Sequence, residues 1–358
     1  MHLLVDISAH GLGHLAQTAP VVEAIRALAP TLRLTIRSAI PRKHLERRIA
    51  AGFAHVAEAR DFGFVMHNAV DIDLAASATR YREFHADWPR RIATEADWLG
   101  KHQVDALLSN VAYLPLAAAA QTGIPAAGLS SLNWADLFSH YFGAAPWATD
   151  IHAQMQAAYN AAQAFLCLTP GLPMTWLQRR HEVGPIARSG HRDRRRVAKL
   201  LGLAESERWL LLAMGGMEFR LPVADWPQTP GLNWLLPGDW KIRRDDTRAA
   251  DPAGLDFSDL LASVDAVLTK PGYGTFVEAA CCGIPILYLE REDWPETPHF
   301  AAWLAANARA EVLTREQLMA GDFTEVLQRL WREPAPAVPV ANGAGQAARC
   351  LVKALGLR

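Results

Sequence analysis

Short apolar runs alternate with helix-like segments along almost the whole chain. In the first half, HLLVDI, LRLTIRS, VDALLSN, IPAAGLSS and AFLCLTP are typical of strands, whereas TAPVVEAIRALA and LPLAAAAQTG are typical of helices. A second series of strand-like runs, WLLLAMGG, LNWLLPG, VDAVLTK and IPILYLE, follows later in the chain. This strand–helix–strand repetition predicts an α/β protein whose parallel sheets are covered by helices on both faces.

A basic, glycine-punctuated stretch from Val183 to Lys199 separates the two series. We therefore expect two doubly wound, Rossmann-like domains, residues 1–187 and 188–341. The run RDRRRVAK favours a solvated helix that enters the second domain, and the alternative is contact with an anionic surface or a phosphate. The segment PAPAVP then predicts a hinge, and residues 342–358 predict a C-terminal helix that covers about 345–355.

Composition places the chain among ordinary globular proteins. Its 358 residues suffice for two domains at about 150 residues each. With 36 basic and 37 acidic side chains there is no global field to attract nucleic acid. The start lacks a basic leader and no apolar run approaches the ~18 residues of a membrane span, so we expect a cytoplasmic protein without a transmembrane segment. Four cysteines lack metal-ligand spacing and are expected to be core residues: Cys167, Cys281, Cys282 and Cys350.

The turn after the first strand, Ser8 to His14, lies at the carboxyl end of a parallel strand, where ligands of open α/β sheets bind. Gly11, Gly13 and Ala16 satisfy G-x-G-x-x-A, so a dinucleotide-binding oxidoreductase is one alternative. Arg37 closes the next strand, where an NADP enzyme would place an arginine. However, two histidines flank the glycines and no hydride-transfer motif follows, so we favour a different chemistry.

His14 is the stronger clue in this turn. An imidazole has an ordinary pKa of about 6.5, so it can take a proton from an attacking hydroxyl at neutral pH. We expect the following helix to begin near Ala16, which leaves His14 in a glycine loop. The alternative is a histidine that only hydrogen-bonds its own backbone. His10 is expected to be a structural partner that donates a hydrogen bond to a neighbouring loop.

In the second half, residues 265–288 predict a strand, a glycine-rich turn with Gly272, a helix and another strand. A helix that starts near Gly274 would point its unpaired N–H groups and its positive dipole end at a ligand above the sheet, which suits a phosphate. Glu278, about one turn further on, could accept hydrogen bonds from the paired hydroxyls of a sugar. The alternative is a plain strand-to-helix turn with a solvated glutamate.

Two further loops are expected at the same sheet edge. Gly215 and Gly216 end the first strand of the second domain, and their backbone can approach a phosphate closely. Residues 290–300, EREDWPETPHF, collect acids, a tryptophan and two prolines, and Glu296 is expected to contact a sugar. The intervening segment MEFRLPVADWPQTP is interrupted by prolines and predicts no long helix.

Together these motifs resemble GT-B glycosyltransferases, which have two Rossmann-like domains and an active site in the cleft between them. HGLGH and TKPGYGTFVEAACCGIP are similar to loops of the inverting GlcNAc transferase that makes lipid II. The chain also resembles the glycosyltransferase-like N-terminal half of plant arabinokinases, through Gly11–His14, Asn133-Trp134, residues 270–275 and residues 295–298.

This resemblance implies an enzyme that transfers a sugar from a nucleotide-diphosphate sugar, with UDP favoured, to a hydroxyl of a small molecule or glycan. His14 would be the base of an inverting reaction, Glu278 would bind the ribose, and Asn133 and Trp134 would lie on the acceptor side. The expected donor-binding or substrate-binding residues are Gly11, Gly13, Gly215, Gly216, Lys270, Gly272, Tyr273, Gly274, Thr275, Glu278 and Glu296.

We expect no metal and no cofactor beyond the donor, because a helix N-terminus would stabilise the leaving diphosphate. Asp71-Ile72-Asp73 has the D-x-D spelling of a metal-binding motif but lies in the first domain. Two other functions stay open: a sugar-nucleotide-binding module without catalysis and a sugar-nucleotide 2-epimerase. The basic residues 42, 43, 47 and 48 fall in one predicted helix and leave peripheral membrane contact open.

Overall fold

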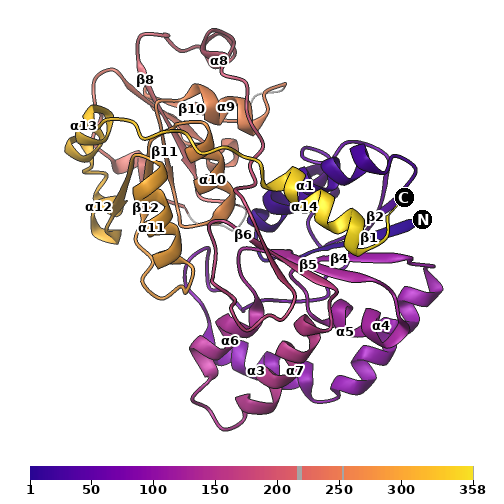
Figure 1. The fold of residues 1–358 in the computed structure, drawn as a ribbon. Coiled ribbons are helices and arrows are strands. Elements are labelled where there is room, and N and C mark those ends of the chain that lie inside the picture. The colour runs from indigo at the N-terminus through magenta and orange to yellow at the C-terminus, as the bar shows by residue number, and fades with distance from the viewer. Residues whose placement is uncertain (216–219, 252–253, 358) are drawn as a thin grey trace. The chain divides into compact units, whose positions relative to one another are not determined.

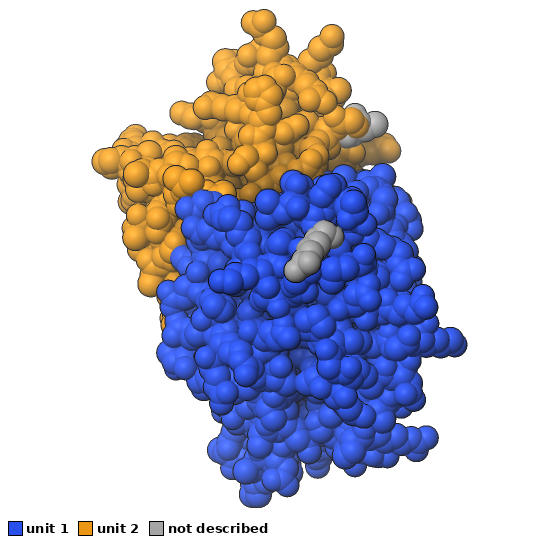
Figure 2. Space-filling view, turned by 45° about the vertical axis from the view of Figure 1, so that its right-hand side comes forward, with its two compact units in different colours: residues 1–67, 71–186, 342–358 blue, residues 68–70, 187–341 orange. Residues whose placement is uncertain are grey.

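The computed structural model describes residues 1–215, 220–251 and 254–357. The chain folds into two compact units (Figure 1, Figure 2). The first unit contains residues 1–67, 71–186 and 342–358, and the second contains residues 68–70 and 187–341.

The described part of the first unit has a seven-stranded parallel sheet in the order β3-β2-β1-β4-β5-β6-β7. Its strands are β1 (His2–Ile7), β2 (Arg33–Arg37), β3 (Phe53–Val56), β4 (Ala106–Asn110), β5 (Ala126–Ser130), β6 (Ala164–Leu168) and β7 (Arg180–Val183). Its helices are α1 (Leu12–Leu28), α2 (Arg42–Leu45), α3 (Leu74–His85), α4 (Trp88–Lys101), α5 (Leu114–Thr122), α6 (Trp134–Phe142), α7 (Ala148–Asn160) and α14 (Gly343–Ala354). The strand order reverses direction from β1 to β4, which is the switch point where ligands of such sheets bind.

The described part of the second unit has a six-stranded parallel sheet in the order β10-β9-β8-β11-β12-β13. Its strands are β8 (Arg208–Ala213), β9 (Leu232–Leu236), β10 (Thr247–Ala249), β11 (Ala266–Thr269), β12 (Ile286–Leu289) and β13 (Ala310–Leu313). Its α-helices are α8 (Arg194–Leu201), α9 (Phe257–Ser263), α10 (Tyr273–Cys281), α11 (Thr297–Asn307), α12 (Arg315–Ala320) and α13 (Thr324–Arg332), and two 3₁₀ turns cover Val223–Asp225 and Gly238–Trp240. As predicted, no long helix occurs in the described residues 220–231.

The C-terminal helix α14 belongs to the first unit, where it packs beside α1 (Figure 1). Gly343 donates its backbone N–H to the Pro185 carbonyl at 3.0 Å, and the Gly184 N–H donates to Gln346 Oε1 at 2.8 Å. Ala347 and Leu351 on the same helix are fully buried. Helix α14 thus contributes to the core of the first unit.

Two predicted helices differ in extent from those observed. The basic helix α2 ends at Leu45, so the arginines at 47 and 48 follow it rather than share its surface. Helix α1 begins at Leu12, one turn before the expected Ala16, and Gly11 precedes it with φ +127°. Because side chains other than glycine rarely adopt that φ, Gly11 makes this early start possible.

An aromatic cluster anchors the core of the second unit. The rings of Trp226 and Trp234 lie 5.0 Å apart, and Phe323 lies 5.3 and 5.4 Å from them in edge-to-face geometry. Pairs of this kind contribute about 0.5–1.5 kcal/mol each beyond the area that they bury. The cluster packs with β8, β9 and β11 side chains, so it supports the strands whose carboxyl ends carry the glycine loops.

Candidate functional site

The first candidate site is built where β1 ends and α1 begins. His14 lies in the first turn of α1 rather than in a loop, and only 6% of its surface is exposed. Strands β1 and β4 are neighbours, and Ile7 lies opposite Asn110 in their register. The end of β4 therefore brings Asn110 beside the first turn of α1.

A chain of buried hydrogen bonds fixes the imidazole of His14. Its Nδ1 lies 2.7 Å from Asn110 Oδ1. Asn110 Nδ2 donates to Gln17 Oε1 at 3.0 Å, and Gln17 Nε2 donates to Ser131 Oγ at 2.9 Å. Gln17 is three residues after His14 on α1, so both side chains lie on the face of the helix that meets β4 and β5.

These bonds determine which nitrogen of His14 carries the proton. In the structure the amide nitrogen of Gln17 donates to Ser131, and its oxygen accepts from Asn110. The oxygen of Asn110 then faces His14, and an oxygen can only accept. The proton of a neutral His14 therefore sits on Nδ1, which leaves the lone pair on Nε2 as the basic atom.

A wholly buried tryptophan holds both histidines of the turn. The ring of Trp134 lies 5.2 Å from that of His10 and 5.8 Å from that of His14. Its indole N–H donates to Asp61 Oδ2 at 2.7 Å. Gly63 has φ +57°, and a Cβ there would lie 2.7 Å from His10 and 2.8 Å from Trp134, so only glycine fits. His10 thus packs against Trp134, whereas its expected hydrogen bond to a neighbouring loop stays a prediction.

The carboxyl group of Asp61 has a raised pKa although the residue is partly exposed. Burial, with a smaller contribution from the nearby Asp6, raises its pKa to about 6, against hydrogen bonds from Trp134 and Ser8 that stabilise the charged form. Asp61 therefore changes charge just below neutral pH, and Trp134 lies between it and His14 as a shared contact.

Arg37 does not serve a nucleotide phosphate. It is 1% exposed and its guanidinium binds Asp6 in two hydrogen bonds of 2.6 and 2.7 Å. The same group pairs with Glu95 and lies 4.2 Å from the ring centre of Trp98. The arginine that favoured an NADP enzyme is thus part of a buried ion network, which removes that support for an oxidoreductase.

The two residues predicted on the acceptor side are both fully buried. Asn133 caps α6, since its Oδ1 accepts from the Asp136 N–H at 2.8 Å. Trp134 contacts the histidines as described above. Their predicted role toward an acceptor therefore stays a prediction. The first unit also contains a pocket of about 770 Å³. It is lined by Leu114 and by residues of the 59–98 region, which include Asp61, Phe62 and Arg91.

The second candidate site is formed at the carboxyl ends of β8 and β11. Gly215 follows β8 with φ +84°, and a Cβ on it would lie 3.2 Å from Lys270 Cε. Thr269 at the end of β11 donates its hydroxyl to the Ala213 carbonyl at 2.6 Å, which holds the two strand ends together. Gly216 lies outside the described residues.

Helix α10 begins directly after this turn. Gly272 is its N-cap residue, no side chain caps the helix, and no acidic side chain lies in its first turn. Gly272 and Thr275 are partly exposed, whereas Tyr273 and Gly274 are buried. A helix start without a side-chain cap presents backbone N–H groups and positive partial charge, which favours an anion.

Lys270 is coupled to the loop after β12. Burial and, to a smaller extent, the cation of Arg291 lower its pKa to about 8, against the carboxylate of Glu296, which raises it. Glu296 is 4% exposed and accepts the indole N–H of Trp294 at 2.9 Å, while the Arg291 guanidinium lies 4.0 Å from the Trp294 ring centre. The structure thus brings Gly215, Lys270 and Glu296 into one site.

Glu278, the predicted ribose ligand, lies on α10 with only 1% of its surface exposed. Its predicted contact with a sugar stays a prediction. Within residues 1–215, 220–251 and 254–357, no group of three or more histidine, cysteine, aspartate or glutamate side chains has a metal-binding arrangement. In the same residues, no helix is long and apolar enough to span a membrane.

Sequence reasoning missed Asn110, Gln17, Asp61 and Arg291. Asn110 is the polar residue that ends the apolar run VDALLSN, and a polar side chain at the carboxyl end of a parallel strand is a signal that could have found it. Gln17 and Asp61 carry no such signal, because their partners are more than 70 residues away in the chain.

No protein-family model matches the chain. The chain is similar to L-arabinokinase of Arabidopsis thaliana, with 27% identity over 346 residues. The match covers 90% of this chain but only 31% of the arabinokinase, so the chain spans about a third of that relative's length.

Several solved structures have a similar fold. The glycosyltransferase of kitacinnamycin matches with a TM-score of 0.63 and 15% identity, over 99% of both chains. A UDP-glucosyltransferase from Polygonum tinctorium that glucosylates indoxyl matches with a TM-score of 0.59 and 15% identity, over 100% of this chain and 99% of that one. Spinosyn rhamnosyltransferase SpnG, solved with thymidine diphosphate, has a TM-score of 0.55 and 15% identity, over 99% and 96%. The chain therefore has the GT-B fold, and the expected similarity to a plant arabinokinase is confirmed.

Proposed function

We propose that this protein is a glycosyltransferase that moves a sugar from a nucleotide-diphosphate sugar to a hydroxyl acceptor. The single observation that carries the proposal is the hydrogen bond of 2.7 Å between His14 Nδ1 and Asn110 Oδ1. It assigns the basic lone pair to Nε2 in an imidazole at the switch point of the first sheet. A general base needs that combination of a fixed tautomer and a position where substrates bind.

The donor is assigned to the second unit. Its diphosphate would lie against the N-terminus of α10 and the Gly215 backbone, with Lys270 as the neighbouring cation. These groups offer hydrogen bonds and positive charge where the leaving group develops negative charge. The ribose would be held by Glu278 and the sugar by Glu296. Uridine is the base that we favour, although the similar structures include both a UDP-dependent enzyme and one solved with thymidine diphosphate.

The acceptor is assigned to the first unit. The pocket of about 770 Å³ formed by residues of the 59–98 region has the volume of a small-molecule site. It includes Asp61, whose partner Trp134 contacts the ring of His14. An acceptor in this pocket would therefore approach the base from the side of the loop that follows β3.

The proposed step is a displacement at the anomeric carbon of the donor. The acceptor oxygen forms the new bond to that carbon while the bond to the diphosphate oxygen breaks, so the configuration inverts. The acceptor proton passes to His14 Nε2, and the electron pair of the broken bond leaves with the nucleoside diphosphate. The helix N-terminus and Lys270 supply the positive charge in this proposal, so no metal ion takes part.

The test begins with the purified protein, a panel of UDP-, TDP- and GDP-sugars, and a library of hydroxyl acceptors, with and without a chelator. We expect nucleoside diphosphate release that depends on an acceptor and persists in the chelator. His14→Ala should lower turnover by the roughly 10²–10⁴-fold effect of a general base and leave donor affinity nearly unchanged. Turnover unaffected by His14→Ala would contradict the assignment.

Two outcomes would favour the other readings. Tight binding of one sugar nucleotide without transfer or slow hydrolysis would identify a binding module. An epimerised sugar nucleotide recovered from donor alone would identify a 2-epimerase.

A further inference from the structure

A second pocket lies in the second unit, at the sheet edge opposite to the glycine loops. Its volume is about 350 Å³. Arg208 begins β8, Asp265 and Pro285 immediately precede β11 and β12, and Arg309 immediately precedes β13. All four strands are parallel, so the pocket opens at their amino ends. It is therefore separate from the donor site proposed at their carboxyl ends.

Three arginines line this small pocket: Arg192, Arg208 and Arg309. The one acidic residue in the described lining is Asp265, and its carboxylate already accepts hydrogen bonds from other residues. Asp265 Oδ1 accepts from Arg208 at 2.9 Å, and Oδ2 accepts from Arg194 at 2.9 Å and from the Trp209 N–H at 2.8 Å. Because Arg194 offsets the charge of Asp265, the pocket keeps an excess of positive charge.

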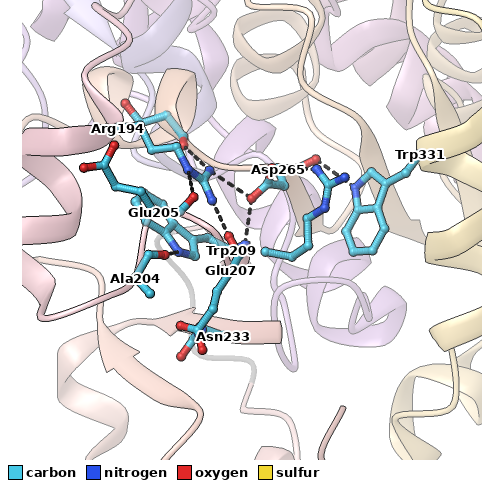
Figure 3. A network of polar contacts seen from close by, with 10 residues as sticks. Arg194, Ala204, Glu205, Glu207, Trp209, Asn233, Asp265 and Trp331 are labelled. Carbon is cyan, nitrogen blue, oxygen red and sulfur yellow. Dashed lines mark hydrogen bonds and ion pairs between the residues drawn. The ribbon is translucent and has the colours of Figure 1, made fainter. Parts of the chain in front are cut away.

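The network around Asp265 is held in place by aromatic rings (Figure 3). Trp331 donates its indole N–H to the Asp265 carbonyl at 3.0 Å, and the Arg208 guanidinium lies 5.0 Å from the Trp331 ring centre. On the other side, Arg194 lies 3.8 Å from the ring centre of Trp209. A guanidinium group that lies over an aromatic ring keeps the N–H groups at its edge available for a further anion. Arg208 is therefore oriented but can still donate hydrogen bonds.

The other two arginines have no such structural task. The guanidinium groups of Arg192 and Arg309 make no hydrogen bond or ion pair with another described residue. An anion bound in this pocket would be attracted by the cations of all three arginines. The rest of the lining is largely apolar or small, and includes Ala262, Val264, Ile284 and Pro285. A ligand would therefore need a doubly charged head and a compact body.

We propose that this pocket binds a small phosphate monoester, with the phosphate between Arg192, Arg208 and Arg309. Arginine forks match phosphate oxygens in bidentate geometry, and each charge-assisted hydrogen bond is stronger than a neutral one. The volume is at the lower end of the range of about 300–1,000 Å³ for small-molecule sites, which fits a sugar phosphate better than a dinucleotide. The same helix α10 that begins at the donor loop ends at this pocket, where Cys281 and Cys282 form part of the wall.

The test is calorimetric titration of the full chain with inorganic phosphate, glucose 6-phosphate and, as a neutral control, glucose. We expect binding of the phosphate compounds and none of glucose. The double variant Arg192→Gln/Arg309→Gln should weaken binding of glucose 6-phosphate by about tenfold or more, the loss expected for charge-assisted hydrogen bonds. Its melting temperature should stay unchanged, because neither side chain has a described structural partner.

A charge-matched variant provides the control. Arg195 and Arg243 are exposed residues of the same unit outside the pocket lining, so Arg195→Gln/Arg243→Gln should bind glucose 6-phosphate like the unmodified chain. A second readout locates the ligand, since a bound phosphate ester should slow the modification of Arg309 by phenylglyoxal. Absence of binding, equal losses in both double variants, or an unprotected Arg309 would each overturn the proposal.

Discussion

The tautomer of His14 can be tested without any knowledge of the substrates. In the structure the Nδ1 proton of His14 is donated to Asn110 Oδ1 at 2.7 Å, and Asn110 is oriented by Gln17. Asn110→Ala removes this acceptor oxygen and leaves the buried Nδ1–H of His14 without it. The loss of such a partner costs about 1–3 kcal/mol.

That free energy sets the size of the expected effect. A change of about 1–3 kcal/mol corresponds to roughly 5- to 150-fold in an equilibrium or a rate. We therefore expect Asn110→Ala to shift the imidazole away from the Nδ1-protonated form and to lower turnover by a factor in this range. Donor affinity should stay the same, because Asn110 lies in the first unit and the proposed donor contacts lie in the second.

Nitrogen NMR of ¹⁵N-histidine-labelled protein reads the tautomer directly, with the His14 signals assigned from their loss in His14→Gln. The matched control is Asn133→Ala, which removes another buried asparagine. It should cost about 1 kcal/mol of stability through the lost cap of α6 but leave the His14 tautomer intact. An Asn110→Ala protein in which Nδ1 stays protonated, or in which both variants shift the tautomer alike, would refute the reasoning.

Three further predictions concern charged groups of the two sites. Glu278→Ala should weaken donor binding by about tenfold or more if this carboxylate accepts the ribose hydroxyls, and an unchanged calorimetric Kd would exclude the contact. Lys270 has a pKa lowered to about 8, so its charge, and with it the affinity for a nucleoside diphosphate, should fall as pH rises from 7 to 9. Lys270→Arg should remove this pH dependence. An affinity that falls equally with pH in both proteins would argue against a role of Lys270 in binding the diphosphate. Asp61 has a pKa raised from 3.8 to about 6, so the folded state holds this proton more tightly than the unfolded chain, and the resulting stability is present at low pH and lost as pH rises through 6. The unfolding free energy of the unmodified chain relative to Asp61→Asn should therefore decline between pH 4 and 7, by at most about 3 kcal/mol and by less because the side chain keeps some exposure; a constant difference across this range would contradict the shifted pKa.

Much of the fold follows from local patterns. Continuous apolar runs of five or six residues predict buried parallel strands, and the glycine-rich turns predict where ligands bind, because these signals lie within a few neighbouring residues. The strands HLLVDI and VDALLSN and the turn at Gly272 occur where they were expected. The start of α1 was placed one turn too late, since the sequence could not show that Gly11 adopts φ +127° and opens the helix before His14.

The candidate sites depended more on distant contacts. Arg37 reads as a phosphate ligand in the sequence, yet its partners Asp6 and Glu95 lie 31 and 58 residues away and bury it. Lys270 and Glu296 were both expected at the donor, but the coupling that involves Arg291 and Trp294 required the loop after β12 to be in place.

The sequence by itself determined that this protein consists of two parallel-sheet units with glycine-rich turns at the ends of their first strands, and that His14 lies close to one of those turns. Only the tertiary structure decided which nitrogen of His14 is basic, because that depends on the order of β1 and β4 in the sheet, which brings Asn110 to the imidazole from 96 residues away. The periodicity of a strand is a local property of the chain, whereas the direction of a buried hydrogen bond is fixed by every partner along its network.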